Sequence, residues 1–501
     1  MILAIDIGSS SLRAAAFSPD GSLMPETLAR QTVAPATDGA GAMTYDAAPL
    51  FDQLAQVVGR ALRAASRQGY SIQGVGISTM MHSLVGARLT PAGQADVGAP
   101  TTPVFAWGDT RSESERENLV EYFASRRLYA RAGCPLHSSY WLLKLSWLRR
   151  SLAIEGWQWM SFAEYAWLRL FGVAYASASL ASATGLYSRQ AGDWDEEILT
   201  ALGLTRKNLT PIADDDLALT GDQLRPPFQS RWSQLRSAKF FPPLGDGACS
   251  NLGSLCFSDE RAAINIGTTA ALRVTAPIDR EPETPPPGLW AYRLDRRHAL
   301  VGGALSNAGN LLAWGRRTLR LPPPPKLEAA LQAARPDETG LTILPFLAGE
   351  RSLGWRPQAT GAIIGLRLST SPVAIWQALL EIIAVRLAWI AEELAGAGLF
   401  PASATCIVSG GVSSSPAFAT MLCHAVGRPI CVIQTEASAR GVALWVSLRL
   451  GLLTLEQCPL PNGQWFHPSA EAHARYRACL LRHRAAYHKL LGPALPNVSD
   501  T

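Results

Sequence analysis

Little in this sequence is charged, and the classes of protein that depend on charge are excluded first. Acidic and basic residues make up 17% of the 501 residues, and only five of the 45 basic residues are lysine. So few charges beside 48% hydrophobic residues exclude extensive disorder. The net charge of +5 includes a cluster at 475–489, which a solvated amphipathic helix explains better than a nucleic-acid-binding patch.

Several familiar motifs are also absent. The eight cysteines form no Cys-x-x-Cys pair, so we interpret them as small buried residues. No Gly-Lys dipeptide occurs, which excludes a Walker-type P-loop, and no Gly-x-Gly-x-x-Gly follows a strand, so a Rossmann dinucleotide site is unsupported. The N-terminus resembles no signal peptide, and the apolar run 374–390 contains Glu381 and Arg386 and is short for a membrane span. We therefore expect a soluble cytoplasmic protein without a membrane or nucleic-acid partner.

What the sequence does contain is a duplicated motif. Residues 2–17 read as strand, Gly-Ser-Ser turn and strand, and residues 262–274 repeat this pattern with a Gly-Thr-Thr turn. The segments 4–10 and 263–269 match in residue class at every position, about half a chain apart. A repeat of this length indicates duplicated domains rather than a solenoid.

Strands alternate with helices between and after the two copies. We expect a buried strand at 72–78, helices at 136–150, 161–171, 304–320 and 374–395, and a strand at 405–409. This alternation predicts an α/β fold. A Pro-Pro-Leu segment precedes Gly245, so we place the domain boundary between a first domain, 1–244, and a second, 245–501.

Each hairpin turn is suited to an anion. Glycine lets the backbone approach closely, so the N–H groups of Ser9 and Ser10 can point at a phosphate. Asp6 ends the first strand, where a carboxylate can hold a hydrated Mg²⁺, and Arg13 can pair with a phosphate oxygen. Gly267 and Thr268 complete a second clamp. A single copy alone would be better explained as an ordinary hairpin with a turn-capping aspartate, and it is the presence of two copies that favours a phosphate clamp.

Asp246 stands between two glycines, at the start of a helical run near the domain boundary. As an N-cap, it would only stabilise that helix. As a general base, it would take the proton from a substrate hydroxyl during phosphoryl transfer. Position alone leaves the two interpretations equal.

Two further polar clusters lie where a core would be apolar. His82 follows the expected strand 72–78 at its carboxyl end, where α/β folds bind ligands. Trp107, Asp109 and Arg111 combine an aromatic plate, a carboxylate and a guanidinium, which suits a hydroxyl-rich ligand. The glycine- and serine-rich segment 409–415 ends a strand and precedes a helix, a fitting cradle for adenosine or simply a tight turn.

Taken in order, these segments resemble the FGGY family of carbohydrate kinases, from Ile2 to about Leu450. The pieces that carry the resemblance are the first hairpin and the segments 107–111, 144–148, 245–253, 265–269, 347–351 and 409–411. The resemblance implies two actin-like, ribonuclease H-like ATPase domains with a cleft between them, which use ATP and Mg²⁺. It assigns the catalytic base to Asp246, with Mg²⁺ near Asp6 and Asp246. The other implied contacts divide into nucleotide contacts at Ser9, Arg13, Gly267, Thr268, Gly309, Gly411 and Ser415, and sugar contacts at His82, Asp109 and Arg111.

Within the family, the segments 80–83, 133–137, 179–187 and 302–307 are most similar to gluconokinases. This implies ATP-dependent phosphorylation of gluconate to 6-phosphogluconate, with Arg111 or Lys144 facing the substrate carboxylate. Xylulose, another pentulose or a polyol stays an alternative substrate. A non-catalytic regulator with the ATPase fold is the rival from another class. The oligomeric state stays open, with a homodimer as one option.

Overall fold

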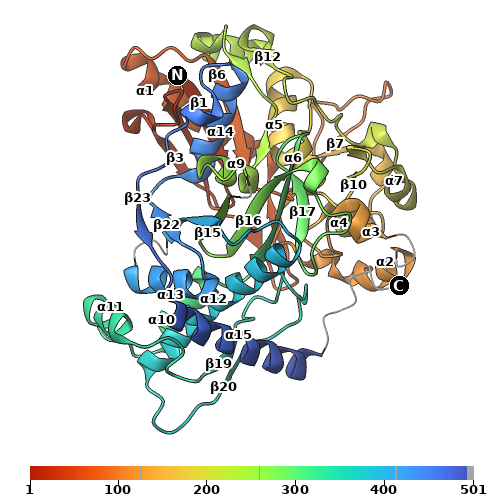
Figure 1. Ribbon diagram of the computed structural model, residues 1–501. Coiled ribbons are helices and arrows are strands. Elements are labelled where there is room, and N and C mark those ends of the chain that lie inside the picture. The colour runs from red at the N-terminus through yellow and green to blue at the C-terminus, as the bar shows by residue number, and fades with distance from the viewer. Residues whose placement is uncertain (124–126, 259, 412–414, 493–501) are drawn as a thin grey trace.

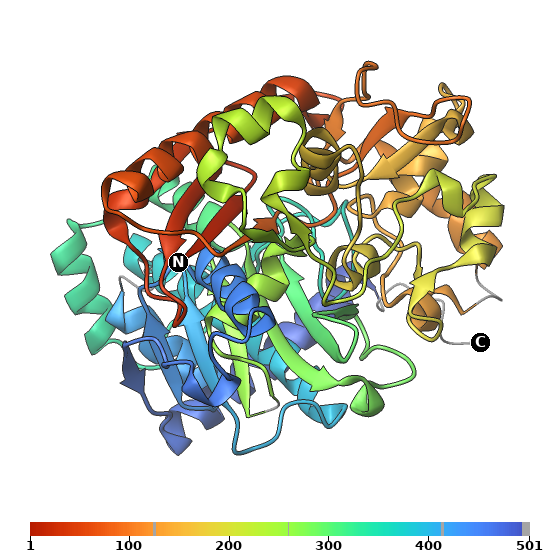
Figure 2. The ribbon, with the colours of Figure 1, turned by 90° about the horizontal axis from the view of Figure 1, so that it is seen from above.

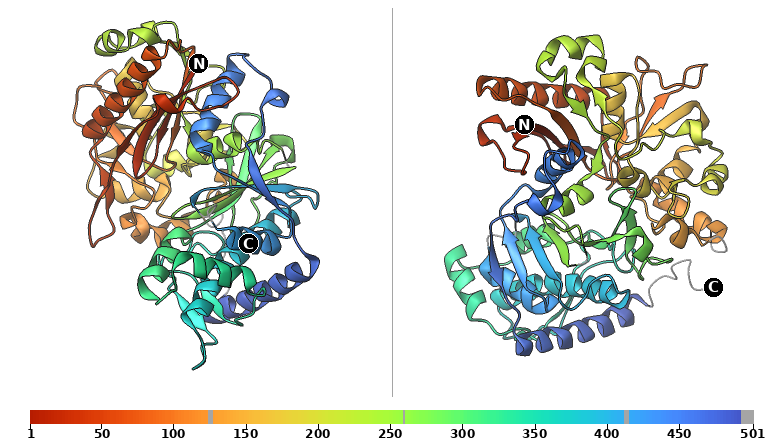
Figure 3. Two further views of the ribbon diagram at one scale, coloured as in Figure 1. Left: turned by 90° about the vertical axis from the view of Figure 1, so that its left-hand side faces the viewer. Right: turned by 45° about the horizontal axis from the view of Figure 1, so that its top comes forward.

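The computed structural model describes residues 1–123, 127–258, 260–411 and 415–492. These residues fold into two α/β units, each built around a mixed sheet with helices against it (Figure 1). Figure 3 shows the units one above the other, with helix α15 along the outer edge of the second. The predicted α/β fold class is confirmed.

The first sheet is formed by the N-terminal half of the chain. Its order along the hydrogen-bonded path is β12 (Leu219–Thr220), β13 (Lys239–Phe240), β6 (Gly74–Thr79), β1 (Ile2–Ile7), β2 (Ser11–Phe17) and β3 (Ala29–Thr32), and β14 (Leu244–Gly245) also pairs with β6. The central strand β1 is antiparallel to β2 and parallel to β6.

The second sheet repeats this arrangement. Its order is β17 (Trp290–Arg293), β18 (His298–Leu305), β16 (Ala270–Pro277), β15 (Arg261–Ile266), β21 (Thr405–Ser409), β22 (Ile430–Ile433) and β23 (Gly463–Phe466). Here β15 is antiparallel to β16 and parallel to β21. The register is also equivalent, because Asp6 lies opposite Ser78 and Asn265 lies opposite Ser409. The two hairpins found in the sequence therefore hold the same place in two sheets of like topology.

Strand β1 is buried on both faces, which explains why all of its residues except Asp6 are apolar. Leu3 and Ile5 pack in one core with helix α1 (Ala47–Arg67), and Ile2 and Ala4 pack in another with helix α14 (Ala437–Arg449). Successive side chains of a strand point to opposite faces, so a strand between two helical layers needs apolar residues at every position.

Helix α14 belongs to the C-terminal half of the chain but covers the first sheet, where Figure 2 shows it in blue beside red strands. A Cβ at Gly76 would come within 2.7 Å of Val442, so this glycine allows the close packing. Helix α9 (Asp246–Gly253) lies against α14, and a Cβ at Gly441 would lie only 1.7 Å from the Cys249 carbonyl oxygen. The boundary between residues 244 and 245 stays a prediction, while α9 and α14 beyond it pack on the first unit.

Helix α12 (Pro372–Gly396) is the core helix of the second unit. Ser371 caps it, since its hydroxyl accepts a hydrogen bond from Ala374 N, and Pro372 occupies its first turn. At 25 residues it is longer than the sequence indicated, and it is long and apolar enough to cross a membrane by length and composition. However, 83% of its most apolar window is buried inside the protein, as expected of a core helix.

The remaining elements surround these sheets. They are the helices α2 (Arg116–Phe123), α3 (Leu128–Ala132), α4 (Trp141–Leu148), α5 (Phe162–Phe171), α6 (Ala178–Ser182), α7 (Glu196–Leu202), α8 (Pro226–Arg231), α10 (Gly309–Thr318), α11 (Pro324–Ala333), α13 (Pro416–Val426) and α15 (Ala470–Leu491), and the strands β4 (Ala36–Thr37), β5 (Met43–Tyr45), β7 (Val85–Arg88), β8 (Val104–Phe105), β9 (Trp157–Met160), β10 (Tyr187–Ser188), β11 (Asp193–Trp194), β19 (Thr342–Leu344) and β20 (Ala362–Ile364). The expected start of the helix at 304–320 is too early, because Ala304 and Leu305 complete strand β18 and α10 begins at Gly309.

All eight cysteines are buried and free. Arginines of α15 pair with acidic neighbours, for example Arg482 with Asp337 at 2.5 Å and Arg484 with Glu392 at 2.9 Å.

Candidate active site

Asp6 lies at the end of β1, largely buried, opposite Arg13 of β2. Arg13 Nη1 is 3.9 Å from Asp6 Oδ2 and also forms an ion pair with Glu436, the residue before α14. Burial raises the pKa of Asp6 to about 6, against the attraction of Arg13. The sequence analysis did not single out Glu436, which connects the first hairpin to the C-terminal half.

Asp246 is the first residue of α9, and Gly245 occupies the N-cap position before it. Burial raises the pKa of Asp246, while Arg273 and the N–H groups of Gly247 and Met81 act in the opposite direction. The charge of Asp246 also raises the pKa of Asp6, so the two carboxyl groups are near neighbours. Because strand β14 beside β6 leads directly into α9, the first sheet brings Asp246 close to the end of β1.

These carboxyl groups fit a magnesium ion that keeps most of its water. Mg²⁺ in phosphoryl-transfer sites is held by one or two carboxylates and by the phosphates of the nucleotide rather than by a full set of protein ligands. In agreement, the described residues contain no group of three or more His, Cys, Asp or Glu that could hold a metal. Asp6 and Asp246 are the residues that would hold Mg²⁺, and the ion would neutralise charge on the phosphates.

The second hairpin turn is fixed to the start of helix α10. Gly309 N donates to Gly267 O at 2.9 Å, and Asn310 N donates to Thr268 O at 3.1 Å. A Cβ at Gly309 would lie 2.5 Å from Gly267 O, so only glycine permits this approach. The structure thus brings together Gly267, Thr268 and Gly309, three of the residues expected to contact nucleotide.

The other expected nucleotide residues are placed as follows. Ser415 caps α13, accepting a hydrogen bond from Phe418 N, and its hydroxyl donates to Glu328 at 2.8 Å. Gly411 lies just beyond β21, and positions 412–414 of the expected cradle lie outside the described residues. In the first turn, Ser9 O accepts from the Tyr45 hydroxyl at 2.5 Å, and the exposed Ser10 accepts through its carbonyl from Val33 N at 3.0 Å.

His82 lies among aromatic side chains and directly follows Met81, whose N–H group acts on Asp246. Its Nδ1 is 2.7 Å from Ala183 O, and burial lowers its pKa to about 3. Since a carbonyl can only accept, we assign the proton of the neutral ring to Nδ1, which leaves Nε2 as an acceptor for a ligand hydroxyl. The rings of Tyr140 and Tyr292 lie 5.0 and 5.9 Å from the His82 ring, and their hydroxyls are 2.7 Å apart.

Trp107 contacts Arg351, whose guanidinium carbon lies 5.1 Å from the Trp107 ring centroid. The positive charge of Arg351 also contributes to the lowered pKa of His82. Arg351 thus connects His82 with Trp107, two residues that the sequence analysis placed in separate polar clusters.

Asp109 and Arg111 form an ion pair with each other. Arg111 Nη2 donates to Asp109 Oδ2 at 2.6 Å and Nε donates to Oδ1 at 3.0 Å, while the Arg111 guanidinium stacks on Trp147. Lys144 is buried and donates to the carbonyls of Ser138 and Ser139 at 2.5 and 2.7 Å. Arg111 and Lys144, the cations proposed to face a substrate carboxylate, thus already have protein partners.

Two arginines that the sequence analysis gave no role lie beside Asp246. Arg273 comes from β16 and Arg351 from the loop after Gly349, and each lowers the pKa of Asp246. Arg273 is the only charged residue within the otherwise apolar strand of the second hairpin, which was a local signal. Arg351 gave no such signal, because only the folded chain brings its loop to α9.

Two hairpin units of one topology, neighbouring carboxyl groups and adjoining hydrogen-bonding and aromatic side chains define a phosphotransferase of the two-domain ATPase fold. Residues 1–219 match the N-terminal domain, and residues 262–448 the C-terminal domain, of the FGGY family of carbohydrate kinases. The chain belongs to this family and is a sugar kinase that uses ATP.

Among curated relatives, a gluconokinase of Bacillus subtilis (strain 168) is 28% identical over 396 residues, which cover 76% of this chain and 74% of the relative. A glycerol kinase of Cereibacter sphaeroides is 25% identical over 503 residues, covering 95% and 96%. Among solved structures, a xylulose kinase and a gluconate kinase of Lactobacillus acidophilus superpose with TM-scores of 0.88 and 0.87. Both are 20% identical; the first match covers 98% of this chain and 99% of that chain, and the second covers 98% of each. These structural likenesses establish the fold.

Proposed function

We propose that this kinase transfers the γ-phosphoryl group of ATP to a hydroxyl of a sugar acid, and that gluconate is its substrate and 6-phosphogluconate its product. The observation that carries the proposal is the position of Asp246. The charge of its carboxyl group acts on Asp6, where the metal-bound phosphates would be, and Asp246 is in turn influenced by Arg351, whose guanidinium stacks on Trp107.

In the reaction, the acceptor oxygen forms a bond to the γ-phosphorus, the bond from that phosphorus to the ADP oxygen breaks, and the hydroxyl proton moves to Asp246. A carboxyl group whose pKa is raised by burial is a stronger base than an exposed one and suits this step. His82 and the paired tyrosine hydroxyls would orient the sugar by accepting from and donating to its hydroxyl groups.

Gluconate is favoured over other substrates by two observations. The segments 80–83 and 133–137 are similar to gluconokinases, and the first of them contains His82, while the gluconokinase relative above has the highest identity among those described. A soluble enzyme in the cytoplasm, where ATP is abundant, fits the same proposal.

The test measures ADP release by the purified enzyme in a coupled assay with gluconate, xylulose, ribulose, glycerol, erythritol and fuculose, at matched concentrations with Mg²⁺. We expect the highest kcat/KM with gluconate and a phosphorylated product at its terminal hydroxyl by NMR. A higher kcat/KM with xylulose or glycerol would replace the substrate in this proposal. An absence of sugar-dependent ADP release across the panel would contradict the catalytic role of Asp246.

A further inference from the structure

Arg273 and Arg351 converge beside Asp246 from two separate segments of the second unit. Arg273 lies opposite Gly302 in the pairing of β16 with β18, and a Cβ at Gly302 would come within 3.2 Å of Arg273 Cγ. A Cβ at Gly247 would lie 3.2 Å from Arg273 Nε. Glycine at both positions therefore allows the side chain of Arg273 to pack closely against the first turn of α9.

Among the described residues, neither guanidinium group forms an ion pair, although the charge of Asp246 acts on both. Arg273 Nη1 and Arg351 Nε are buried and have no hydrogen-bond partner among the described residues, and within these residues neither arginine forms an ion pair. Arg351 Nη2 donates to the Leu305 carbonyl oxygen at 3.3 Å. Desolvation lowers the pKa of both groups, which shows that burial disfavours their charge.

Other buried arginines of the same protein are paired with carboxylates. Arg386 binds Glu350 at 2.5 Å, and Arg189 and Arg293 both bind Glu281, at 2.7 and 2.5 Å. Leaving a buried charge unpaired is costly in free energy. The difference from the paired arginines therefore indicates that Arg273 and Arg351 bind an anion that a ligand supplies.

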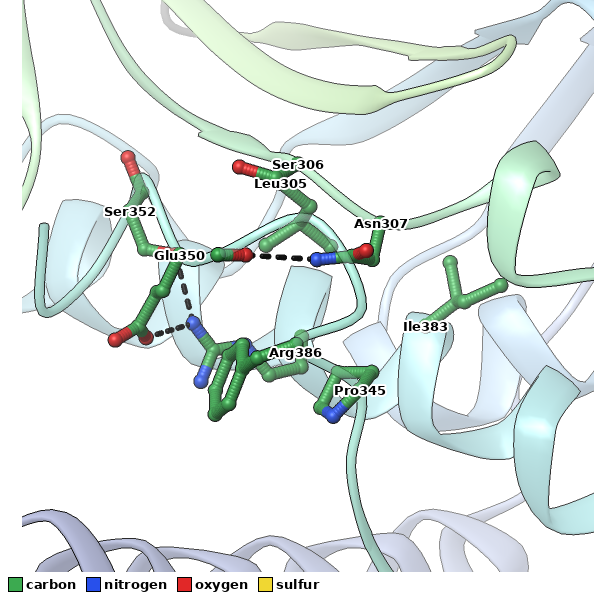
Figure 4. Close-up of a pocket in the computed structure, with 10 residues that line it drawn as sticks. Leu305, Ser306, Asn307, Pro345, Glu350, Ser352, Ile383 and Arg386 are labelled. Atoms are coloured by element: carbon green, nitrogen blue, oxygen red, sulfur yellow. Dashed lines mark hydrogen bonds and ion pairs between the residues drawn. The ribbon is translucent and has the colours of Figure 1, made fainter. Parts of the chain in front are cut away.

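The loop that carries Arg351 is held rigidly on both sides of it (Figure 4). Arg386 of α12 binds Glu350 and also donates to Ser352 O at 2.7 Å, so the residues before and after Arg351 share one partner. Asn307 holds the same loop by donating to Gly349 O at 2.8 Å. Because its neighbours are fixed in the core, Arg351 is presented to the site with little freedom to swing away.

We propose that Arg273 and Arg351 form a subsite that binds the carboxylate of a sugar acid while a hydroxyl of the same molecule faces Asp246. Two guanidinium groups can each donate to a carboxylate, and such charge-assisted hydrogen bonds are among the strongest that proteins make. This inference rests on the proposed sugar-acid kinase activity and names the residues behind its substrate preference. Arg111 and Lys144 do not compete for this role, because Asp109 and two backbone carbonyls already occupy them.

A phosphoryl group of ATP is the other anion that two arginines beside Asp246 would bind. The two sources differ in a simple way: only a carboxylate subsite distinguishes gluconate from glucitol, which has an uncharged CH₂OH group at the same carbon. An arginine that binds only phosphate would affect both sugars equally.

The experiment measures the dissociation constants of gluconate and glucitol by calorimetry, without nucleotide, for the wild-type protein and for Arg273→Gln and Arg351→Gln. The wild-type protein should bind gluconate about 10- to 100-fold more tightly than glucitol. Each substitution should weaken gluconate binding by about tenfold or more and leave glucitol binding unchanged. The matched control is Arg88→Gln. Arg88 stacks on Trp157 at 4.2 Å, much as Arg351 stacks on Trp107, but it is the last residue of β7 and its side chain is exposed.

Equal losses for gluconate and glucitol, or equal affinities of the wild-type protein for the two, would overturn the subsite. The wild-type comparison needs no variant and stays decisive if a substituted protein does not fold. Arg351→Lys, which keeps the charge but loses the planar fork, should retain part of the preference for gluconate. If the enzyme phosphorylates a different aldonate and the arginine variants lose that acid selectively, the subsite stands while gluconate as the substrate fails.

Discussion

The two hairpins of this kinase are alike in backbone and different in charge. In each, a central strand pairs antiparallel with the returning strand and parallel with a third strand. At equivalent positions the first hairpin has Asp6 opposite Arg13, and the second has Asn265 opposite Ala271. The duplicated fold thus provides the same turn twice, and side chains give each turn a different task.

The environment of each turn agrees with this division. In the second, Asn265 Nδ2 donates to Ser409 Oγ at 3.0 Å, and the turn carbonyls accept from the first residues of α10, so the contacts are neutral and made largely by backbone. In the first, Asp6, Arg13 and Glu436 form a charged group next to Asp246. We infer that the first hairpin serves the metal and the transferred phosphoryl group, and the second cradles the nucleotide.

The sharpest test of this difference is the substitution Asp246→Asn. The amide cannot accept the proton of the acceptor hydroxyl, so kcat should fall by roughly 10²–10⁴-fold, the usual contribution of general acid–base catalysis. KM for the sugar should change little, because the shape of the residue is preserved. Steady-state kinetics with gluconate and ATP measures both, and a kcat near that of the wild-type enzyme would reduce Asp246 to a residue that stabilises the start of α9.

The next effect concerns Asp6→Asn, which gives the first hairpin the neutral amide of the second. Loss of the carboxylate should raise the Mg²⁺ concentration needed for half-maximal activity by about 10- to 100-fold. The control is Asn265→Ala at the equivalent position, which should leave the Mg²⁺ requirement unchanged. A Mg²⁺ titration at saturating substrates makes the comparison, and equal responses of the two variants would remove the division of tasks.

Much of the fold was predictable because its signals are local. The apolar run 2–5 of β1 and the Gly-Ser-Ser turn predicted the first hairpin, and the matching segment at 263–269 predicted the second. The extent of β18 was not predictable, since Ala304 and Leu305 fit a helix by periodicity and are held in a strand by pairing with β16. The return of α14 to the first sheet depends on contacts between segments far apart in the chain.

Candidate site residues could be predicted where they stand out in a short sequence motif. They could not be predicted where folding brings together residues from distant segments of the chain. Asp6 stands out in an apolar strand and Asp246 between two glycines, and the charge of Asp246 acts on Asp6 in the folded chain. Arg111 looked suitable for a carboxylate, but folding places it against Asp109. The loop that carries Arg351 is held by Arg386 of α12, which donates to Ser352 O, and the spacing of these residues along the chain does not reveal this contact.

A smaller effect is expected from Gly267→Ala in the second turn. A Cβ there would meet only Thr269 O, at 4.0 Å, so the empty protein should accept alanine without loss of stability. If phosphate approaches the turn closely, the added methyl group should raise KM for ATP about tenfold, the loss of one charge-assisted hydrogen bond, and leave KM for the sugar unchanged. Thermal unfolding and kinetics test the two halves of the prediction, and an unchanged KM for ATP would mean that nucleotide does not approach Gly267.

The smallest expected effect is a pH dependence of stability that only the first hairpin has. Burial raises the pKa of Asp6 from 3.8 to about 6 in the folded protein, so the folded state binds this proton more tightly than the unfolded chain. The contribution of Asp6 to the free energy of unfolding should therefore increase as pH falls through 6, by about 1.4 kcal/mol between pH 8 and pH 5. Asp6→Asn cannot titrate, so the difference in stability between wild type and variant should shift by this amount in favour of the wild type at pH 5. Urea denaturation with EDTA present measures the difference without a cation to hold the carboxylate ionised. Asn265→Ala should show no such shift, and a difference between wild type and Asp6→Asn that stays constant with pH would place Asp6 in a more hydrated environment than its burial implies.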